Sequence, residues 1–471
     1  MSKIIRLNEI GPVIAEKFKD KKYITCYVAS NAVTPTASLR AITDYIKTGA
    51  QMPFMRMVSL LLLGEVPYVE PGLQDKIMAY SIFSGPTMRK AVNEGRAYYL
   101  PCTLANLESM IGKDRPFRPD IVIAKVTKDP RSGTYNLGPS LEAMYTAIDN
   151  AQLVIAELDD TMPFVNGGDL DKSSIDYLIV DNGVEGLHSY ITGFEDLPLR
   201  AKQGIRRAGE LIVRHFIRDG VTLQIGIGEI TDAIASLIKD ARPKDLGCQT
   251  ELYGDGLMSL QKAGIITNRH KKMNAWRSTT SLLMGSSELY EFAHMRPGLE
   301  LRPCTYTNAA HIIRANGNEK FPFISINTAV SVDLGGNVWA DYIDATRYYS
   351  GVGGQPDFVR ALNDLQYGVA IIVMLSTTTS GITKIVKAHP AGVTLTACSY
   401  DNIVVVTEHG IADLRGLGVG CKARALAHVA DESVRDNLLR YIDENKRLFI
   451  APRHSRKLSG FIPYDGPMPL D

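Results

Sequence analysis

The chain has 471 residues, of which 45% are hydrophobic and 22% charged, a composition typical of a globular protein that excludes extensive disorder and fibrous repeats. This length suits two large domains or three domains of roughly 150 residues each. The 52 Lys and Arg residues nearly balance the 51 Asp and Glu residues, and the formal net charge of +1 gives no overall field that favours nucleic acid or an anionic membrane. An anionic ligand must therefore be bound by local groups.

The N-terminal region and the apolar stretches predict neither a leader peptide nor a membrane span. The conspicuous apolar stretch at 57–64 is far shorter than the ~20 residues that cross a bilayer. Glu9, Glu16 and Asp20 argue against signal and transit peptides, so we expect a cytoplasmic protein. The cysteines form no CxxC pair, which predicts reduced and mostly buried thiols, with neither a zinc site nor a disulfide framework.

Short β-branched apolar runs alternate with helical patterns along the chain. Because the runs are continuous rather than alternating, they predict mostly parallel strands with helices on both faces, which is the α/β class. The predicted strands are at 23–28, 121–126, 153–157, 221–227, 369–375 and 403–407.

A linker at 192–200, where periodicity is lost, divides the chain into an expected N-terminal domain at 1–195 and a C-terminal domain at 200–471. A helix is predicted over 205–216, ended by Gly220 in a left-handed C-cap. The last dozen residues, with Pro463, Pro467 and Pro469, are typical of a loose tail.

Gly226 and Gly228 lie between the strand at 221–227 and a helix expected to open at Thr231 and Asp232. Backbone N–H groups at such a turn can bind an anion, although the glycines would equally serve close packing of helix on strand. A dinucleotide site would require a third glycine at 231, where Thr stands.

Three further segments contain candidate chemical groups. Glu251 lies between two turns that open helices, which suits chemistry on a bound group, although an ion-paired or capping role is the common alternative. The glycine-dense loop at 350–358 would let backbone N–H groups approach a ligand and complete an oxyanion hole. Glu408, His409 and Arg415 follow the strand at 403–407, although a lone histidine is more often a surface residue.

These segments together resemble the acetyl-CoA hydrolase/CoA-transferase family, the class I CoA transferases that act on acetate, butyrate, succinate or 4-hydroxybutyrate. Five motifs occur in the family's order: Gln-Ile-Gly-Ile-Gly at 224–228, Thr-Glu-Leu-Tyr-Gly-Asp-Gly at 250–256, Ser-Ile-Asn-Thr-Ala-Val-Ser-Val-Asp at 325–333, Gly-Val-Gly-Gly-Gln-Pro-Asp-Phe at 351–358 and Val-Thr-Glu-His-Gly-Ile-Ala-Asp-Leu-Arg-Gly at 406–416. The N-terminal part matches more loosely, with Asp159 where relatives often have Asn.

The resemblance implies two similar open, mostly parallel-sheet α/β domains with the active site between them. It assigns Glu251 as nucleophile, the N–H groups of Ile227 and Gly353 as oxyanion donors, Asn308 as a supporting amide and Glu408 as a substrate-side carboxylate. Coenzyme A contacts are implied for Gly226, Ile227, Gly228, Glu229, Ile230, Gly353 and Gly354. Glu229, Thr379 and Ser380 depart from the family pattern at the phosphate contacts.

The implied reaction moves CoA between an acyl-CoA and a small carboxylate through a glutamyl-CoA thioester, by ping-pong kinetics. Coenzyme A is a co-substrate, no metal or other cofactor is expected, and a homo-oligomer is compatible with the sequence. An acyl-CoA hydrolase on the same fold is the near alternative. A dinucleotide-dependent oxidoreductase and a non-catalytic CoA-binding regulator are more distant ones.

Overall fold

The computed structural model describes residues 2–129, 132–450 and 460–466. The chain forms two compact units. The first comprises Met1–Tyr190, Thr279–Thr307 and Tyr348–Gly353, and the second comprises Ile191–Ser278, Asn308–Arg347 and Gly354–Asp471. Each unit combines three separate segments of the chain, whereas the domains expected at 1–195 and 200–471 are contiguous. The limits of those domains stay a prediction.

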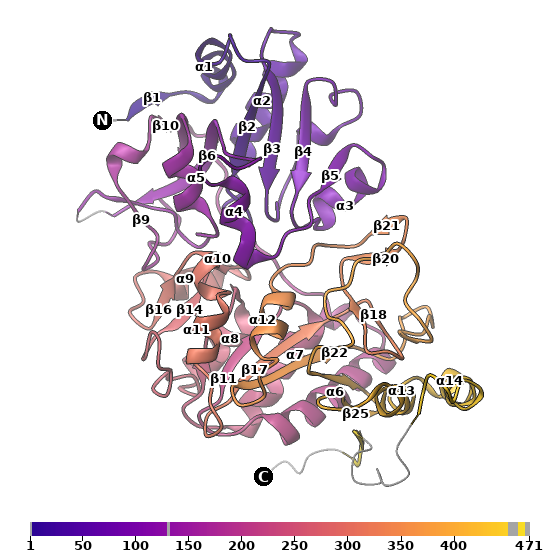
Figure 1. Ribbon diagram of the computed structural model, residues 1–471. Coiled ribbons are helices and arrows are strands. Elements are labelled where there is room, and N and C mark those ends of the chain that lie inside the picture. The colour runs from indigo at the N-terminus through magenta and orange to yellow at the C-terminus, as the bar shows by residue number, and fades with distance from the viewer. Residues whose placement is uncertain (1, 130–131, 451–459, 467–471) are drawn as a thin grey trace. The chain divides into compact units, whose positions relative to one another are not determined.

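The first unit is built on a parallel sheet with the strand order β1-β10-β8-β6-β2-β3-β4-β5 (Figure 1). The strands are β1 (Lys3–Ile5), β2 (Tyr23–Val28), β3 (Phe54–Ser59), β4 (Ile77–Ser81), β5 (Ala97–Tyr99), β6 (Ile121–Lys128), β8 (Leu153–Leu158) and β10 (Tyr177–Ile179). The short strands β7 (Tyr135–Asn136) and β9 (Asp169–Leu170) extend it from β6. Its helices are α1 (Ile10–Lys17), α2 (Thr36–Lys47), α3 (Pro86–Asn93), α4 (Leu107–Ile111), α5 (Met144–Asn150), α9 (Ser287–Ala293) and α10 (Cys304–Thr307).

The second unit has a sheet in the order β12-β11-β17-β22-β24-β25-β26, parallel from β12 to β24 and antiparallel beyond (Figure 1). The strands are β11 (Thr222–Ile225), β12 (Gly247–Cys248), β17 (Phe323–Thr328), β22 (Gly368–Val373), β24 (Ile403–Thr407), β25 (Gly410–Asp413) and β26 (Phe461–Pro463). The helices are α6 (Leu199–Phe216), α7 (Glu229–Ala241), α8 (Asp255–Lys262), α11 (Ala310–Ala315), α12 (Gln355–Ala361), α13 (Val419–His428) and α14 (Glu432–Glu444).

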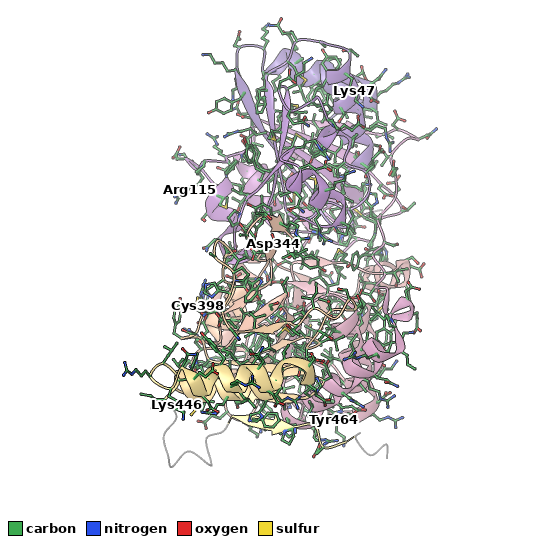
Figure 2. The ribbon with its side chains drawn as sticks, turned by 90° about the vertical axis from the view of Figure 1, so that its right-hand side faces the viewer. Lys47, Arg115, Asp344, Cys398, Lys446 and Tyr464 are labelled. Atoms are coloured by element: carbon green, nitrogen blue, oxygen red, sulfur yellow. The ribbon has the colours of Figure 1, made fainter. Side chains whose placement is uncertain are left out.

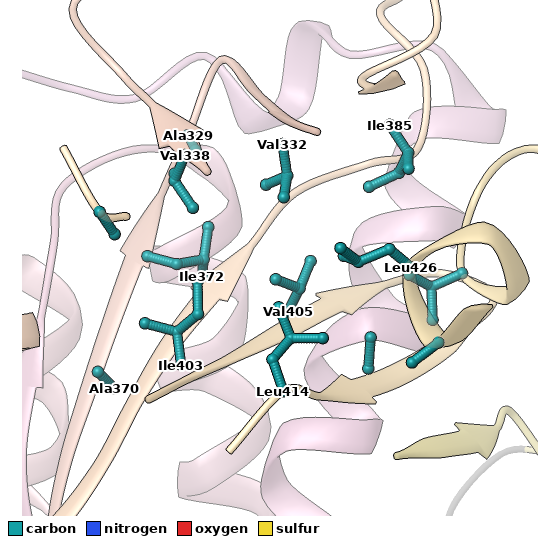
Figure 3. Close-up of a cluster of buried hydrophobic side chains, with 14 of the residues drawn as sticks. Ala329, Val332, Val338, Ala370, Ile372, Ile385, Ile403, Val405, Leu414 and Leu426 are labelled. Atoms are coloured by element: carbon teal, nitrogen blue, oxygen red, sulfur yellow. The ribbon is translucent and has the colours of Figure 1, made fainter. Parts of the chain in front are cut away.

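The core of the second unit explains why β22 and β24 are almost entirely apolar. Ala370 and Ile372 of β22 and Val405 of β24 belong to one buried cluster (Figure 3). The same cluster contains side chains of α12 and α13. Since side chains alternate along a strand, the buried Ile371 and Val404 face the opposite side, where α6 contacts β24 and α7 contacts β17. Helices thus cover both faces of this sheet, which confirms the α/β prediction.

The predicted elements differ from the structure mainly at turns. The strands at 23–28 and 403–407 coincide with β2 and β24, whereas β11 ends at Ile225, short of the predicted 227. Helix α6 begins inside the predicted linker and ends at Phe216, followed by Ile217 in an extended conformation. Gly220 has a φ of +77°, but it lies in the turn that leads to β11, so its assignment as a helix C-cap is wrong.

The expected loose tail is wrong for part of the C-terminus. Phe461–Pro463 form β26, which pairs with β25 although it contains Pro463. The hydroxyl of Tyr464, labelled in Figure 2, donates to Glu210 of α6 at 2.8 Å. Pro467 and Pro469 lie outside the described residues.

Candidate active site

The parallel strands of the second unit end at one edge of the sheet, and three predicted site segments follow those ends. Gly226 comes directly after β11, Glu251 shortly after β12, and Glu408 directly after β24. In open α/β sheets, ligands bind beyond the carboxyl ends of the strands. The three segments therefore share the edge at which a ligand is expected.

The turn after β11 leaves backbone N–H groups without an acceptor among the described residues, including that of Ile227. The N–H of Gly226 donates to the carbonyl of Ile326 at 2.9 Å, whereas no described residue accepts from the N–H of Ile227. A Cβ at Gly228 would meet no atom within 4 Å, so close packing does not explain this glycine. Its φ of +129° does explain it, because residues with a side chain rarely adopt that conformation.

Helix α7 begins at Glu229, with Gly228 as its N-cap, so the predicted start at Thr231 and Asp232 is too late. The Thr231 hydroxyl donates to the Gly228 carbonyl at 2.8 Å, and Asp232 accepts from the hydroxyl of Thr192 at 2.8 Å. Thr231 therefore makes a local contact inside the first turn of the helix, whereas Asp232 contacts a residue 40 positions earlier in the chain, and neither side chain opens the helix.

A closed polar network next to the glycine turn fixes the ends of β11 and β17. The amides of Gln224 and Asn327 bond reciprocally at 3.1 and 3.0 Å, and Ser325 donates to the Gln224 oxygen. All three residues are buried. A fully paired network of this kind is rigid, so it holds the turn at Gly226 in one position.

Glu251 has a defined set of partners within the second unit. The Asn308 side-chain amide donates to its Oε2 at 3.0 Å, and the backbone N–H of Gly354 donates to the same carboxylate. Asn308 Nδ2 also donates to Asp357 Oδ2 at 3.1 Å. One amide group therefore bridges two carboxylates.

The pKa of Glu251 is raised to about 7, chiefly because burial disfavours the charged carboxylate. The negative charge of Asp357 raises this pKa further, while the hydrogen bonds from Asn308 and Gly354 oppose the shift. The side chain is half-buried rather than sealed. Such a carboxylate is sufficiently desolvated to be nucleophilic and is ionised in part of the molecules near pH 7.

Gly354 must remain a glycine for a steric reason. A Cβ at this position would overlap the Glu251 carboxylate and the Asn308 amide. Gly354 is also the N-cap of α12, whose first turn contains Asp357. The glycine-dense loop therefore brings backbone against the Glu251 carboxylate, whereas its predicted part in an oxyanion hole stays a prediction.

Glu408 is held by Ser376, a residue that follows the end of β22. Its two carboxylate oxygens accept from the N–H of Ser376 at 2.8 Å and from the Ser376 hydroxyl at 2.7 Å. His409 Nε2 lies 3.8 Å from Glu408 Oε1 and is buried without a hydrogen bond to any described residue. Arg415 forms an ion pair with Asp413 at 2.7 Å, so its charge is already matched locally.

The remaining predicted ligand contacts are Gly353, Glu229 and Ile230. Gly353 has a φ of +57°, and its carbonyl accepts from the N–H of Leu104 at 3.3 Å within the first unit. Glu229 and Ile230 form the half-buried start of α7. Their contacts with CoA stay predictions.

Family models match both halves of the chain. The acetyl-CoA hydrolase/transferase N-terminal domain matches residues 2–185, and the C-terminal domain of the same family matches residues 285–442. A 4-hydroxybutyrate coenzyme A transferase of Clostridium kluyveri is 34% identical over 82% of this chain and 86% of its own length. The chain belongs to the acetyl-CoA hydrolase/transferase family. The sequence-based assignment to this family of enzymes is confirmed.

Two further similarities extend this result. A butyryl-CoA:acetate CoA-transferase of Anaerostipes caccae is 30% identical over 76% of this chain and 78% of its own length. The crystal structure of RipA from Yersinia pestis superposes with a TM-score of 0.81 at 24% identity, covering 94% of this chain and 97% of that one. The two proteins therefore share a fold although most of their residues differ.

The described residues contain neither a candidate membrane-spanning helix nor a candidate metal-binding cluster. No helix in that part of the chain combines the length and apolar character needed to cross a bilayer. No group of three or more His, Cys, Asp or Glu side chains there is arranged to hold a metal ion. Five of the six cysteines are buried and Cys398 is half-buried, which confirms the expectation of mostly buried cysteines.

Three residues near the site had no predicted role. Asp357 lies in a motif that the sequence did single out, but its link to Asn308 joins positions 49 residues apart. Ser376 and Lys384 are ordinary residues in a polar loop, and only the folded chain brings Ser376 onto Glu408. No local signal identifies such partners before the sheet order is known.

Proposed function

We propose that this protein is a CoA transferase that moves CoA between an acyl-CoA and a small carboxylic acid of the acetate, butyrate or 4-hydroxybutyrate class. The observation that carries the proposal is the half-buried Glu251 carboxylate, with its raised pKa, on the Gly354 N–H and the Asn308 amide. Family membership supports the same chemistry. Coenzyme A is the co-substrate.

The reaction starts when the ionised Glu251 attacks the thioester carbonyl. The C–S bond breaks, CoA thiolate leaves, and a mixed anhydride forms between Glu251 and the acyl group. The thiolate then attacks the Glu251 carbonyl and releases the first acid as a carboxylate. An incoming carboxylate reverses these two steps and leaves as the new acyl-CoA.

Each attack places negative charge on a former carbonyl oxygen, which backbone donors can stabilise. The N–H groups of Ile227 and Gly353 are the proposed donors, and each such donor is worth about 3 kcal/mol of transition-state stabilisation. The free N–H of Ile227 supports this role. Asn308 keeps the attacking carboxylate oriented through its 3.0 Å hydrogen bond.

Hydrolysis by water is the competing function, because both activities occur in the family name. Initial rates with varied acyl-CoA and varied acid should give parallel double-reciprocal lines for a transferase, since the two substrates react in separate half-reactions. Intersecting lines, or release of free CoA at one rate whether or not an acid is present, would contradict transfer and favour the hydrolase.

A further inference from the structure

The loop after β22 forms a short hairpin whose base lies beside Glu408. Thr377 and Thr383 pair in an antiparallel bridge, and the N–H of Lys384 donates to the Ser376 carbonyl at 2.8 Å. Ser376 also holds the Glu408 carboxylate through its N–H and its hydroxyl. Lys384 is therefore brought to the same edge of the sheet as Glu408.

The side chains of Glu408 and Lys384 differ in the hydrogen bonds that they form. Each carboxylate oxygen of Glu408 already accepts a short hydrogen bond from Ser376. The Lys384 ammonium, in contrast, forms no hydrogen bond or ion pair within 4.0 Å with any residue of the described ranges. An ammonium has three N–H donors, so this group can bind an additional acceptor.

Lys384 also lies in an environment that disfavours its charge. The side chain is half-buried, and burial lowers its pKa to about 8, against the attraction of Glu408. An unpaired cation in such a position costs stability, and groups of this kind are common at functional sites. A bound anion would remove that cost.

We propose that Lys384 binds the carboxylate of the acid substrate, with Glu408 as its fixed counter-charge. This inference rests on the proposed function and names the group that recognises the acid. A singly charged carboxylate suits the place, because the ammonium and Glu408 nearly cancel each other before the ligand arrives. A CoA phosphate would carry more negative charge toward Glu408 and would be repelled.

The test compares Lys384→Met and Lys384→Arg in steady-state kinetics with butyryl-CoA and acetate, each varied. Lys384→Met is expected to raise the KM for acetate at least about tenfold, the loss expected for one charge-assisted hydrogen bond, and to change the KM for butyryl-CoA far less. Lys384→Arg should restore most of the affinity for acetate. The matched control is Lys387→Met, an exposed lysine on the same segment that stacks on Tyr441 and should leave both KM values unchanged.

Three results would overturn the inference: an unchanged KM for acetate in Lys384→Met, a rise confined to the KM for butyryl-CoA, or a fall in kcat alone.

A second measurement uses the unaltered enzyme and does not depend on how the variants fold. Amine acylation of Lys384, followed by peptide mass spectrometry, should slow when acetate is added, while Lys387 reacts at a constant rate. Equal labelling of Lys384 with and without acetate contradicts acid binding. The CoA adduct on Glu251 tests the proposed function separately, so the two claims can fail independently.

Discussion

Glu142 in the first unit and Glu251 in the second each have a carboxyl group whose pKa is raised to about 7, and burial is the main cause in both. Glu142 is fully buried, and its carboxylate accepts from Tyr27, Asn31 and Ser140 at distances of 2.8–3.2 Å. Glu251 is only half-buried and shares its amide donor with Asp357. A raised pKa alone therefore does not mark a nucleophile, because access to a substrate must accompany it.

Replacing Glu251 and Glu142 in turn by Gln should give the largest difference in turnover, because only Glu251 is the proposed nucleophile. Glu251→Gln removes the attacking oxygen and should lower turnover at least about a thousandfold, as losses of covalent nucleophiles do. Glu142→Gln should stay within about threefold of the unaltered enzyme. Acyl-CoA:acid exchange rates, measured on variants with native circular dichroism, check this pair. Normal turnover in Glu251→Gln would contradict the assignment of Glu251 as the nucleophile.

The close approach of backbone to Glu251 gives the next largest effect. Gly354→Ala places a methyl group on the carboxylate and on Asn308, so turnover should fall on the order of a hundredfold. Gly418→Ala is the matched control, since a Cβ there meets nothing within 4 Å and Gly418 is likewise an N-cap, of α13. Equal turnover in the two variants would show that the loop does not define the position of the carboxylate.

Replacement of Glu142 should change the free energy of unfolding rather than the rate of turnover. Because its folded pKa is raised above the unfolded value of 4.5, the folded state binds the proton more tightly and loses relative stability as the pH rises from about 4.5 to 7. Glu142→Gln cannot ionise and should lack this loss, which is at most about 3 kcal/mol. Urea unfolding at pH 5 and pH 8 measures the difference. If the free energy of unfolding changed equally with pH in the unaltered protein and in Glu142→Gln, the raised pKa of Glu142 would be contradicted.

The smallest expected effect concerns Asp357. Its charge raises the pKa of Glu251, so Asp357→Asn should shift the acidic limb of the pH–rate profile to lower pH, by less than about one unit because burial is the larger cause. The surface change Asp364→Asn removes the same charge from an exposed position and should leave the limb in place. A shift to higher pH in Asp357→Asn would contradict this electrostatic account.

Sequence reasoning succeeded where the signal is local. The apolar runs predicted β2 and β24 to the residue, because a strand buried on both faces is largely apolar. The motifs likewise placed Gly226 and Glu408 after predicted strands, and these strands, β11 and β24, prove to be parallel members of one sheet. The order of these strands follows from long-range pairing, which no single segment encodes.

The errors have equally physical causes. The start of α7 at Glu229 depends on the unusual φ of Gly228, whereas Thr231 and Asp232 only have the composition of a helix start. The strand at Phe461–Pro463 was missed because Pro463 normally argues against a strand, although it is tolerated at a sheet edge. The Asn308–Asp357 contact was missed because it is purely tertiary.

The most direct test of the central claim is a search for CoA bound covalently to Glu251. Incubation with acyl-CoA in the absence of an acceptor acid should increase the mass of the peptide containing Glu251 by that of CoA less one water. The adduct should disappear on addition of acetate or on reduction with borohydride, and it should be absent from Glu251→Gln. Turnover without any such adduct, or an adduct on another residue, would contradict the account.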